Sequence, residues 1–520
     1  MQRVPWYVGG MLGCFAATMV AGLPLQGAEP PISIGSRLEL MIDDFLVAQM
    51  SGGARRVLHH PTPREIVLVG DSPWEGSGCN YFSVFQDGDR YRMYYHGWQL
   101  TVTQGKVTLP HDLFTCYAES RDGIHWRKPE LGLVEYQGSK KNNIVLATGK
   151  LGPVAIDAGH IAVFKDENPS CPPDARIKAM VLTHKPFGLL PLASPDGLHF
   201  RPMCDKPVIT QGAFDSQNLA FWDPTLGAYR AYWRIFTAGV TTGKTWQPAG
   251  LRAIRTATSK DLLTWSEPVD LTYVDSPPEQ LYTNAVKPYH RAPHILMGFP
   301  TRYVERGWSP SMEALPELEH RRLRSSAAPR YGMALTDGLL MTSRDGRLFH
   351  RFNEAFLPPG PERPGTWNYG HQYIAWHPVE TASCLEGAPR ELSFYATESY
   401  WTGTKSELRR YTLRLDGFAS VQAPRSGGEL LTRPLVFQGS KLLLNFATSA
   451  AGSIRVEIQD ATGKPLPGFA LADCPPIFGD AVQRPVAFKQ PAALKSLAGT
   501  PVRLRFELAD ADLFAFRFAE

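Results

Sequence analysis

The chain has 520 residues, of which 43% are hydrophobic and 11% aromatic, so it can bury at least one large core and form more than one domain. Its formal net charge is only +4, and its lysines and arginines form neither a block nor a basic helix. The composition therefore excludes a charge-driven nucleic-acid-binding protein. The 46 glycines and 44 prolines alternate with short apolar runs, which favours many strands and turns over long helices.

Residues 1–28 have the pattern of a secretory signal peptide. One positive charge, Arg3, precedes a stretch of small and apolar residues, and Pro24 lies shortly before the predicted cleavage near Ala28. An uncleaved anchor helix is the alternative. The leader predicts a secreted or periplasmic protein, and no later segment is apolar enough to span a membrane.

The cysteines beyond the leader contain no CxxC pair, so no metal site is indicated. We interpret them as buried free thiols, with a disulfide between Cys171 and Cys204 as the alternative. The chain also lacks the glycine patterns of dinucleotide sites and the histidine pattern of zinc proteases. We therefore expect no cofactor.

Residues 32–70 precede the first copy of a recurring turn. In this turn, Ser-x-Asp is followed by Gly and then by an aromatic residue, as in "ESRDGIHW". An Asp-Gly pair suits the positive φ angles of a tight hairpin, and the aromatic side chain can pack between neighbouring sheets. The aspartates of the five copies, the last of which is looser, are Asp122, Asp196, Asp261, Asp345 and Asp416.

An apolar strand, a polar turn and an alternating strand precede each copy of this turn, beginning near residues 81, 161, 219, 285 and 373. Each unit thus supplies four antiparallel strands, which is one propeller blade, and the repeat predicts an all-β, five-bladed β-propeller. A set of unrelated sandwich hairpins is the alternative, but it predicts no common order of elements.

We predict three parts in the chain: a signal peptide at 1–28, the propeller at 29–425 and a small C-terminal β-sandwich at 426–520. Within residues 32–70 we expect a strand that closes the ring against the last blade, because closure removes exposed sheet edges. The last part alternates apolar and polar residues without the turn motif, which is typical of sandwich strands.

The fullest copy of the turn, "SRDGIHWRKP", resembles that of glycoside hydrolases of families thirty-two and forty-three and their relatives. The segments "DDFLV" and "FDSQNLAFWDP" are similar to those of exported hydrolase-like proteins common in planctomycete-type bacteria. The resemblance implies a carbohydrate substrate. Those hydrolases carry a catalytic aspartate at the start of the inner strand of the first blade, where this chain has Asn80. Their catalytic set therefore cannot be transferred directly.

In a propeller, the starts of first strands and the ends of second strands share one rim. These positions carry polar groups throughout, as a sugar pocket requires, because each sugar hydroxyl needs a hydrogen-bond partner. The predicted substrate-binding residues are Asn80, His96, His184, Asn218, Arg234, Arg302, His371 and Trp401. The arginines and histidines among them favour an anionic glycan over a neutral one.

Three rim carboxylates are the candidate catalytic groups. Asp215 begins a nearly apolar strand, where burial can tune a carboxyl group, and a turn-capping role is the alternative. Glu398 ends a second strand just before Tyr400 and Trp401, which could stack on a sugar, and an exposed strand-end glutamate is the alternative. Asp157 is the third candidate, since its blade carries a transition-state-stabilising aspartate in the resembling hydrolases.

The leading functional hypothesis is a secreted glycoside hydrolase that uses paired carboxylates on a polysaccharide or oligosaccharide. A non-catalytic glycan-binding propeller is the second hypothesis, and a polysaccharide lyase with a histidine or tyrosine base is the third. The expected partner is a carbohydrate, with neither nucleic acid nor, after signal cleavage, a membrane. The sequence leaves the oligomeric state open.

Overall fold

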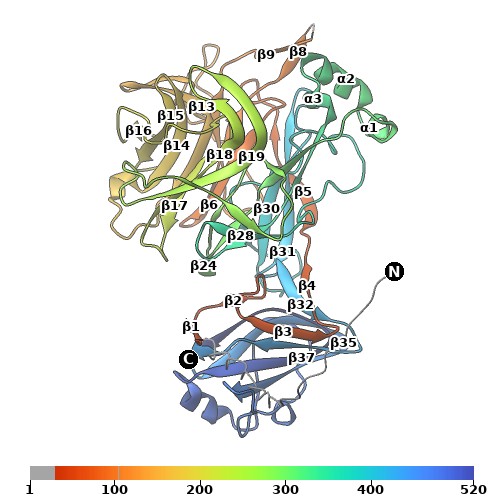
Figure 1. Cartoon of the computed structure of the whole chain (residues 1–520). Coiled ribbons are helices and arrows are strands. Elements are labelled where there is room, and N and C mark those ends of the chain that lie inside the picture. Colours follow the sequence, from red (N-terminus) through yellow and green to blue (C-terminus); the bar gives the residue numbers. More distant parts are fainter. Residues whose placement is uncertain (1–29, 104) are drawn as a thin grey trace, which may run out of the picture.

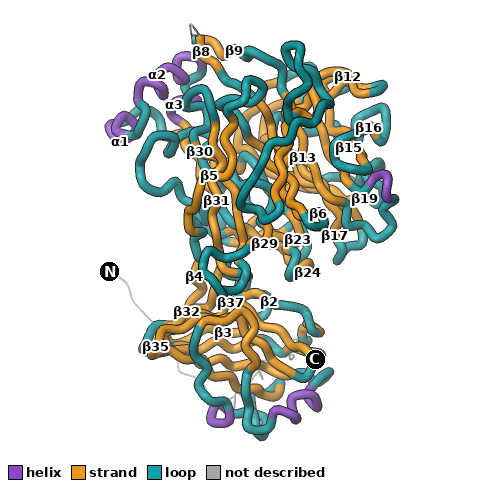
Figure 2. Tube along the Cα trace, turned by 180° about the vertical axis from the view of Figure 1, so that it is seen from behind, coloured by secondary structure: helices purple, strands orange, loops and turns teal. Residues whose placement is uncertain are grey.

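The computed structural model of the protein describes residues 30–103 and 105–520 and is built mostly of β-strands (Figure 1). The predicted signal peptide lies outside these residues. In the described part of the chain, no helix combines the length and apolar character needed to cross a membrane. Figures 1 and 2 show a larger body of several sheets and a smaller body around the long strands β35 (Lys441–Asp460) and β37 (Val502–Ala519).

The larger body contains five sheets that follow one another along the chain. The first consists of β6 (Asn80–Asp87), β7 (Arg90–Gly97), β10 (Phe114–Ser120) and β11 (Ile144–Ala147). The second consists of β12 (Gly149–Leu151), β13 (Val154–Lys165), β14 (Ile177–His184), β15 (Phe187–Ser194) and β16 (Arg201–Pro202). The third consists of β17 (Leu219–Asp223), β18 (Ala228–Thr241), β19 (Trp246–Ser259) and β20 (Val269–Asp270).

The fourth sheet consists of β23 (Lys287–Tyr289), β24 (Ala292–Gly298), β27 (Met341–Ser343), β28 (Leu348–Arg351) and β21 (Thr272–Val274). The fifth consists of β29 (Val379–Thr381), β30 (Glu391–Glu398), β31 (Ser406–Arg414) and β5 (Thr62–Gly70). Apart from the parallel pair β21 and β28, neighbouring strands in these sheets are antiparallel. β5 comes from residues 32–70, where we expect a closing strand, and pairs with β31 of the fifth sheet.

The five sheets are joined into a closed ring by side-chain hydrogen bonds between each sheet and the next. Four of these bonds come from tyrosine hydroxyls, and three of those four end on the backbone of a predicted Asp turn. In ring order they are Tyr94 to Gly197 at 2.9 Å, Asn168 to Tyr229 at 3.1 Å, Tyr232 to Gly346 at 2.9 Å, Tyr289 to Asp416 at 2.8 Å, and Tyr395 to Gly123 at 2.5 Å. The last bond joins the fifth sheet to the first.

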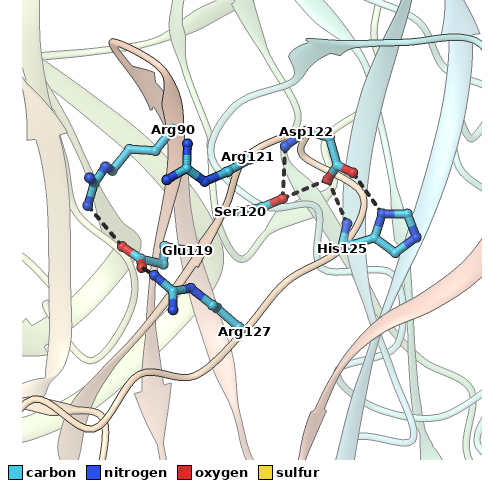
Figure 3. A pocket seen from close by; sticks show the side chains of 7 residues that line it. All are labelled: Arg90, Glu119, Ser120, Arg121, Asp122, His125 and Arg127. Atoms are coloured by element: carbon cyan, nitrogen blue, oxygen red, sulfur yellow. Dashed lines mark hydrogen bonds and ion pairs between the residues drawn. The ribbon is translucent and has the colours of Figure 1, made fainter.

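Four of the five predicted Asp turns share one hydrogen-bond pattern, and each follows the third strand of its unit. In the first copy the Ser120 hydroxyl donates to Asp122 at 2.8 Å (Figure 3). The same hydroxyl accepts the Gly123 N–H at 2.9 Å. The Asp122 carboxylate also accepts two backbone N–H groups at 2.8 Å. The same bonds occur at Asp196, Asp261 and Asp345.

The aromatic residue after the first turn packs as expected, because the Trp126 ring lies 5.7 Å from that of Tyr395 in the fifth sheet. The fifth turn differs from the other four. Asp416 follows β31 at the corresponding place, but it is buried and accepts hydrogen bonds from Tyr289, Arg291 and Asn445. In the other four turns the residue after the aspartate has a positive φ angle. In the fifth turn Asp416 itself has a positive φ angle, 62°.

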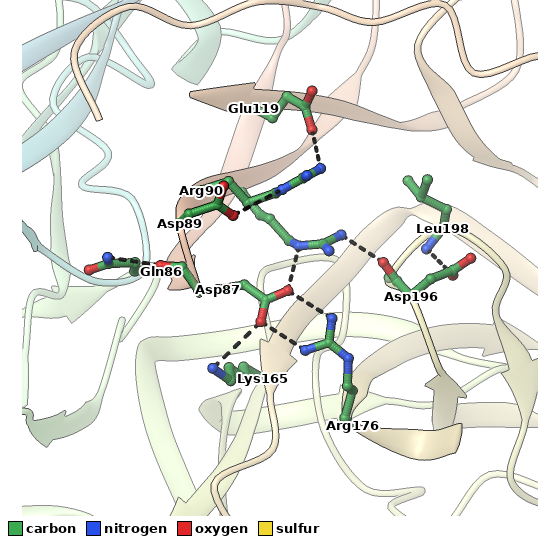
Figure 4. Close-up of polar contacts among 12 residues, drawn as sticks. Gln86, Asp87, Asp89, Arg90, Glu119, Lys165, Arg176, Asp196 and Leu198 are labelled. Carbon is green, nitrogen blue, oxygen red and sulfur yellow. Dashed lines mark hydrogen bonds and ion pairs between the residues drawn. The ribbon is translucent and has the colours of Figure 1, made fainter. Parts of the chain in front are cut away.

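An ion-pair cluster holds the first and second sheets together at the end of β6 (Figure 4). The Asp87 carboxylate receives two hydrogen bonds from Arg176, at 2.8 and 3.0 Å, and lies 3.5 Å from the ammonium group of Lys165. Arg92 donates a third hydrogen bond at 2.9 Å. Burial raises the pKa of Asp87, but these cations outweigh it and lower the pKa to about 2. The carboxylate therefore acts as a junction between sheets.

The smaller body is a ten-stranded sheet that joins both ends of the described chain. Its core is formed by apolar side chains of the long strands, including the stacked rings of Phe437 and Phe518. The strands are β1 (Ile32–Gly35), β2 (Glu39–Leu40), β3 (Val47–Gly52), β4 (Arg55–Leu58), β32 (Ala419–Ala423), β33 (Gly428–Thr432), β34 (Leu435–Phe437), β35, β36 (Asp480–Pro485) and β37. Residues 32–58 thus pair with C-terminal strands and not with the ring.

An insertion between β24 and β27 carries most of the helical structure. It contains β25 (Thr301–Glu305), which pairs with β22 (Gln280–Leu281) on one side and with β26 (Ala334–Gly338) on the other. It also contains the helices α1 (Pro310–Ala314), α2 (Leu318–Ala327) and α3 (Arg330–Met333). The Ser309 hydroxyl caps α1 by accepting the Met312 N–H. Figure 2 shows these helices at one end of the ring, where α2 contacts the small hairpin of β8 (Thr101–Thr103) and β9 (Lys106–Thr108).

Three short 3₁₀ helices complete the secondary structure of the described residues, namely η1 (Pro173–Ala175), η2 (Leu471–Asp473) and η3 (Pro491–Leu497). The cysteines in this part of the chain are free thiols, so Cys171 and Cys204 form no disulfide. Cys79, Cys116 and Cys474 are buried as expected, whereas Cys384 is exposed.

Candidate active site

Asp215 lies in the loop before β17, and its side chain is 48% exposed to a cavity of about 400 Å³. Asn218 holds this loop, because its amide donates to the carbonyls of Phe214 and Ser216 at 2.9 and 2.8 Å. Asn218 also accepts the backbone N–H of Arg234. The predicted binding residue Asn218 thus fixes the position of Asp215 from within the protein.

One arginine pairs with Asp215 at the floor of the cavity. The guanidinium group of Arg234, on β18, donates to the Asp215 carboxylate and is almost completely buried. Its guanidinium carbon also lies 4.7 Å from the centre of the Tyr282 ring. Because Arg234 is fixed on both sides, it holds one oxygen of Asp215 and leaves much of this carboxylate facing the cavity.

Glu305, at the end of β25, lines the same cavity. Its carboxylate accepts a hydrogen bond from the Tyr303 hydroxyl at 2.7 Å. Glu305 and Tyr303 are two positions apart on a strand and therefore lie on the same face. The cavity thus brings two carboxylates together, Asp215 and Glu305, and the sequence hypothesis includes only the first.

Further side chains complete the cavity wall. Arg252 on β19 and Arg330 at the start of α3 line it, as does the ring of Trp246, which is 45% exposed. The predicted aromatic residue Trp401 is buried instead, with its ring 5.0 Å from Trp98 and 4.9 Å from Tyr331. Among the aromatic side chains that line this cavity, Trp246 is therefore the most exposed one.

A cluster of tyrosine and histidine side chains adjoins the cavity. Tyr81 directs its hydroxyl toward the backbone carbonyl of Asp215 at 3.5 Å, and its ring lies 5.9 Å from His96 and 5.8 Å from His160. Asn80 lies next to Tyr81 and accepts its N–H at 2.6 Å. Burial lowers the pKa of His96 to about 3, so this ring is neutral at pH 7.

The buried Asp157 carboxylate interacts with two histidines at the edge of this cluster. It lies 3.1 Å from the His160 ring and 3.0 Å from that of His184, which is exposed. Burial raises the pKa of Asp157, but these histidines outweigh it and hold the pKa well below its usual range. Burial in turn lowers the pKa of His160, and the charge of Asp157 outweighs that effect and raises it.

Glu398 is a sealed carboxylate at the end of β30, only 1% exposed. Arg363 donates to it at 2.5 and 2.6 Å, and Arg409 donates at 2.7 and 3.1 Å. Burial raises the pKa of Glu398, but the hydrogen bonds and charges of both arginines outweigh it and lower the pKa to about 2. Glu398 is not among the residues that line the cavity beside Asp215.

The remaining predicted residues also have internal partners. Arg302 donates to Asp337 at 2.9 and 2.6 Å and to Glu279 at 3.2 Å. His371 is fully buried and accepts the Trp367 N–H at 3.1 Å, and burial lowers its pKa to about 3. The structure therefore gathers Asn80, His96, Asp157, His184, Asp215 and Arg234 in and beside the cavity, whereas Arg302, His371 and Glu398 are held elsewhere by internal contacts.

No family model matches the chain. Over 60 residues it is 42% identical to two uncharacterised proteins from strains of Mycobacterium tuberculosis, which covers 12% of this chain and 19% of each relative. The chain thus spans about a fifth of the length of the curated relatives it matches.

Solved structures with similar backbones share little sequence with this chain. An N-acetylgalactosamine deacetylase from F. plautii has a TM-score of 0.39 at 11% identity, covering 70% of this chain and 96% of that protein. A glycosyl hydrolase from Bacteroides ovatus has a TM-score of 0.39 at 12% identity, covering 68% and 93%. An α-L-arabinofuranosidase from Coprinopsis cinerea has a TM-score of 0.38 at 10% identity, covering 68% and 97%. At these TM-scores the similarity establishes neither the fold nor the function of this chain.

Proposed function

We propose that the five ring sheets are the blades of a five-bladed β-propeller and that the ten-stranded sheet is a smaller β-sandwich beside it. The bonds that join each sheet to the next, and the fifth to the first, support the ring. We move the domain boundary from residue 425 to just before β32, because both β32 and residues 32–58 pair with strands of the ten-stranded sheet. Residues 1–28 remain a proposed signal peptide, which makes the protein secreted or periplasmic.

We infer that the protein is a glycoside hydrolase acting on a polysaccharide or oligosaccharide. The observation that carries this proposal is the presence of two carboxylates, Asp215 and Glu305, in one cavity with the exposed ring of Trp246. Glycoside hydrolysis requires one carboxyl group to protonate the leaving oxygen and a second to activate water or attack the anomeric carbon. An exposed aromatic face supplies the stacking surface that a sugar ring needs.

In this proposal Asp215 is the base or nucleophile, because Arg234 fixes one of its oxygens and the other is free to face the anomeric centre. Glu305 is the general acid, since its hydrogen bond from Tyr303 leaves a carboxyl oxygen available for a proton. The proton passes from Glu305 to the leaving oxygen as the glycosidic bond breaks. Asp215 then either takes a proton from the attacking water or forms a glycosyl ester that water hydrolyses.

Glu305 replaces Glu398 in this scheme because a general acid must bind and release a proton during each cycle. Four charge-assisted hydrogen bonds from Arg363 and Arg409 keep Glu398 ionised and buried. Asp157 is assigned a supporting role. It orients His160, which contacts Tyr81 beside the cavity.

A polysaccharide lyase is the second candidate, and Tyr282 is the observation that favours it. Burial raises the pKa of this cavity-lining phenol, but the Arg234 guanidinium outweighs burial and leaves the pKa below its usual value. A phenolate can take the proton from C5 of a uronate while the bond from C4 to the leaving oxygen breaks. The product is then an unsaturated uronate that absorbs in the ultraviolet, and hydrolysis gives no such product.

The proposal is tested by incubating the purified protein with a panel of plant and algal glycans and measuring released reducing ends. We expect release from at least one glycan without ultraviolet absorbance, and loss of this release in Asp215→Asn. Release with ultraviolet absorbance would identify a lyase. Binding of a glycan without any release would identify a non-catalytic binding propeller and contradict the hydrolase.

A further inference from the structure

Two of the arginines in the cavity lack an acidic partner. Arg234 pairs with Asp215, but neither Arg252 nor Arg330 has a carboxylate within ion-pair distance among residues 30–103 and 105–520. We propose that Arg252 and Arg330 bind the carboxylate or sulfate group of an acidic sugar. This inference rests on the proposed function for the identity of the site as a sugar pocket, and it names the residues that select the substrate.

Both guanidinium groups are held in place by tyrosine rings. The guanidinium carbon of Arg252 lies 4.2 Å from the ring centre of Tyr303 and 5.2 Å from that of Tyr282. Arg330 lies 4.6 Å from the ring centre of Tyr331 and 5.7 Å from that of Tyr369. Stacking of this kind fixes the plane of a guanidinium group without consuming its N–H donors. The two forks are therefore positioned before a ligand arrives.

Several donors of these groups are unused. Arg252 donates from one terminal nitrogen to Gln280, yet its Nε is buried without a partner. Arg330 makes one long contact, 3.4 Å, with the Tyr331 hydroxyl, and its Nη1 is buried without a partner. A buried charged donor that lacks an acceptor is costly, so such donors in a cavity wall call for a ligand that supplies one.

The charge balance of the cavity supports an anionic ligand. Three guanidinium groups, those of Arg234, Arg252 and Arg330, face two carboxylates, those of Asp215 and Glu305. One arginine is neutralised by Asp215, and Glu305 bonds to Tyr303 and not to an arginine. The cavity thus retains a net positive charge near Arg252 and Arg330. A guanidinium fork matches a carboxylate or sulfate oxygen pair in geometry as well as in charge.

Arg302 provides a contrast, because it is one of the two arginines, with Arg234, that the sequence predicts as sugar-binding residues. The Arg302 guanidinium group donates hydrogen bonds to Asp337 and Glu279, so it has no free pair of N–H groups for a ligand. Arg252 and Arg330 lie on β19 and α3, outside the inner strands of the ring. The anion selection proposed here therefore comes from the hairpin of β18 and β19 and from the helical insertion.

The test measures binding by calorimetry with matched pairs that differ in charge: trigalacturonate against its methyl ester, triglucuronate against its methyl ester, and galactose 6-sulfate against galactose. We expect the charged member of at least one pair to bind at least about tenfold more tightly, and the preference to fall as salt is added. The uronate and sulfate pairs identify the source of the anion. Equal binding within all three pairs would overturn the proposal.

Arg252→Gln and Arg330→Gln should each remove most of the charge preference, a loss of about tenfold, because a fork is lost. Arg252→Lys keeps the positive charge but lacks the paired N–H groups of a guanidinium, so it should retain only part of the charge preference. The matched control is Arg255→Gln, on the same strand but paired with Asp270 outside the cavity, which should keep the full preference. Preservation of the preference in folded Arg252→Gln and Arg330→Gln would overturn the proposal. Binding can be measured without turnover. If no glycan is hydrolysed but charged sugars still bind more tightly than neutral ones, the hydrolase proposal is rejected and the anion-binding proposal stands.

Discussion

The cavity beside Asp215 and the sealed site of Glu398 are built from the same residue types, a carboxylate and arginines, each beside the end of a strand. Asp215 meets one guanidinium group and its side chain is 48% exposed, whereas Glu398 accepts four hydrogen bonds from two guanidinium groups and its side chain is 2% exposed. A fully paired carboxylate holds elements together. A carboxylate in a cavity with only one cationic partner has an oxygen free for a substrate. The number of arginine contacts therefore distinguishes the structural Glu398 from the candidate catalytic Asp215.

The largest effect expected from this comparison is that of Glu305→Gln. An amide cannot donate the acid proton, so turnover of a natural glycan should fall by about 10²-fold or more. An aryl glycoside with a good leaving group needs no proton, and its turnover should fall far less. The measurement is kcat for both kinds of substrate.

Exposed Glu267, outside the cavity, provides the matched control, and Glu267→Gln should leave both rates unchanged. An equal loss on the natural and the aryl substrate in Glu305→Gln would show that Glu305 is not the general acid.

A stability effect is expected at the sealed site. The pKa of Glu398 is lowered from 4.5 to about 2, so its ion pairs stabilise the fold above the unfolded pKa, and this stabilisation is lost as the pH falls toward the folded pKa. At pH 7, Glu398→Gln should lower the free energy of unfolding by about 3 kcal/mol. Urea unfolding of both proteins between pH 7 and pH 2 measures the difference.

The difference between wild type and Glu398→Gln should shrink as the pH drops from 4.5 to about 2, because wild-type Glu398 then becomes protonated too. A difference that stays constant over this range would contradict the assignment of Glu398 as a sealed ion pair.

Asp157 is an intermediate case, since it is buried like Glu398 but its partners are titratable histidines. The smallest expected effect is a shift in the titration of His160. Burial lowers its pKa while Asp157 outweighs burial and raises it, so Asp157→Asn should leave burial opposed only by the more weakly acting Asp215 and lower the pKa of His160. NMR titration of the histidine rings measures the shift. His184 and His96 also face Asp157, and Asp215 and Arg234 face His160. Of these groups Asp215 raises the pKa of His160 and Arg234 lowers it, so an unchanged His160 titration would assign the raised pKa to Asp215.

Much of the ring could be predicted because its signals are local. The Ser-x-Asp turn closes its hydrogen bonds within six residues, so each copy is visible in the sequence by itself. The looser copy at Asp416 uses the same place in its sheet but bonds to Tyr289 and Asn445, which are distant in the chain. The sequence also does not reveal which strands pair with β1 to β4. Alternation of polar and apolar residues determines which face of a strand is buried but not which strand lies beside it.

The candidate site divides in the same way. Asp215 is recognisable as a charge in front of an apolar strand, whereas the arginines that seal Glu398 come from positions 35 and 11 residues away. Glu305 carries no such signal, because it lies three positions after Arg302 and a pairing of the two charges explains it equally well. Residues three apart on a strand lie on opposite faces, so Glu305 and Arg302 face opposite sides. Glu305 instead shares a face with Tyr303, whose hydroxyl donates to it.

The most direct test of the account compares kcat for Asp215→Asn and Glu398→Gln on the same glycan at pH 7, below the unfolding temperature of both variants. We predict that Asp215→Asn loses about 10²-fold to 10⁴-fold in kcat, because the amide keeps the shape of the side chain without its basicity. Glu398→Gln should retain turnover of the same order as wild type despite its lower stability. The opposite order, with Asp215→Asn active and folded Glu398→Gln inactive, would contradict the central claim that the partly paired carboxylate is the catalytic one.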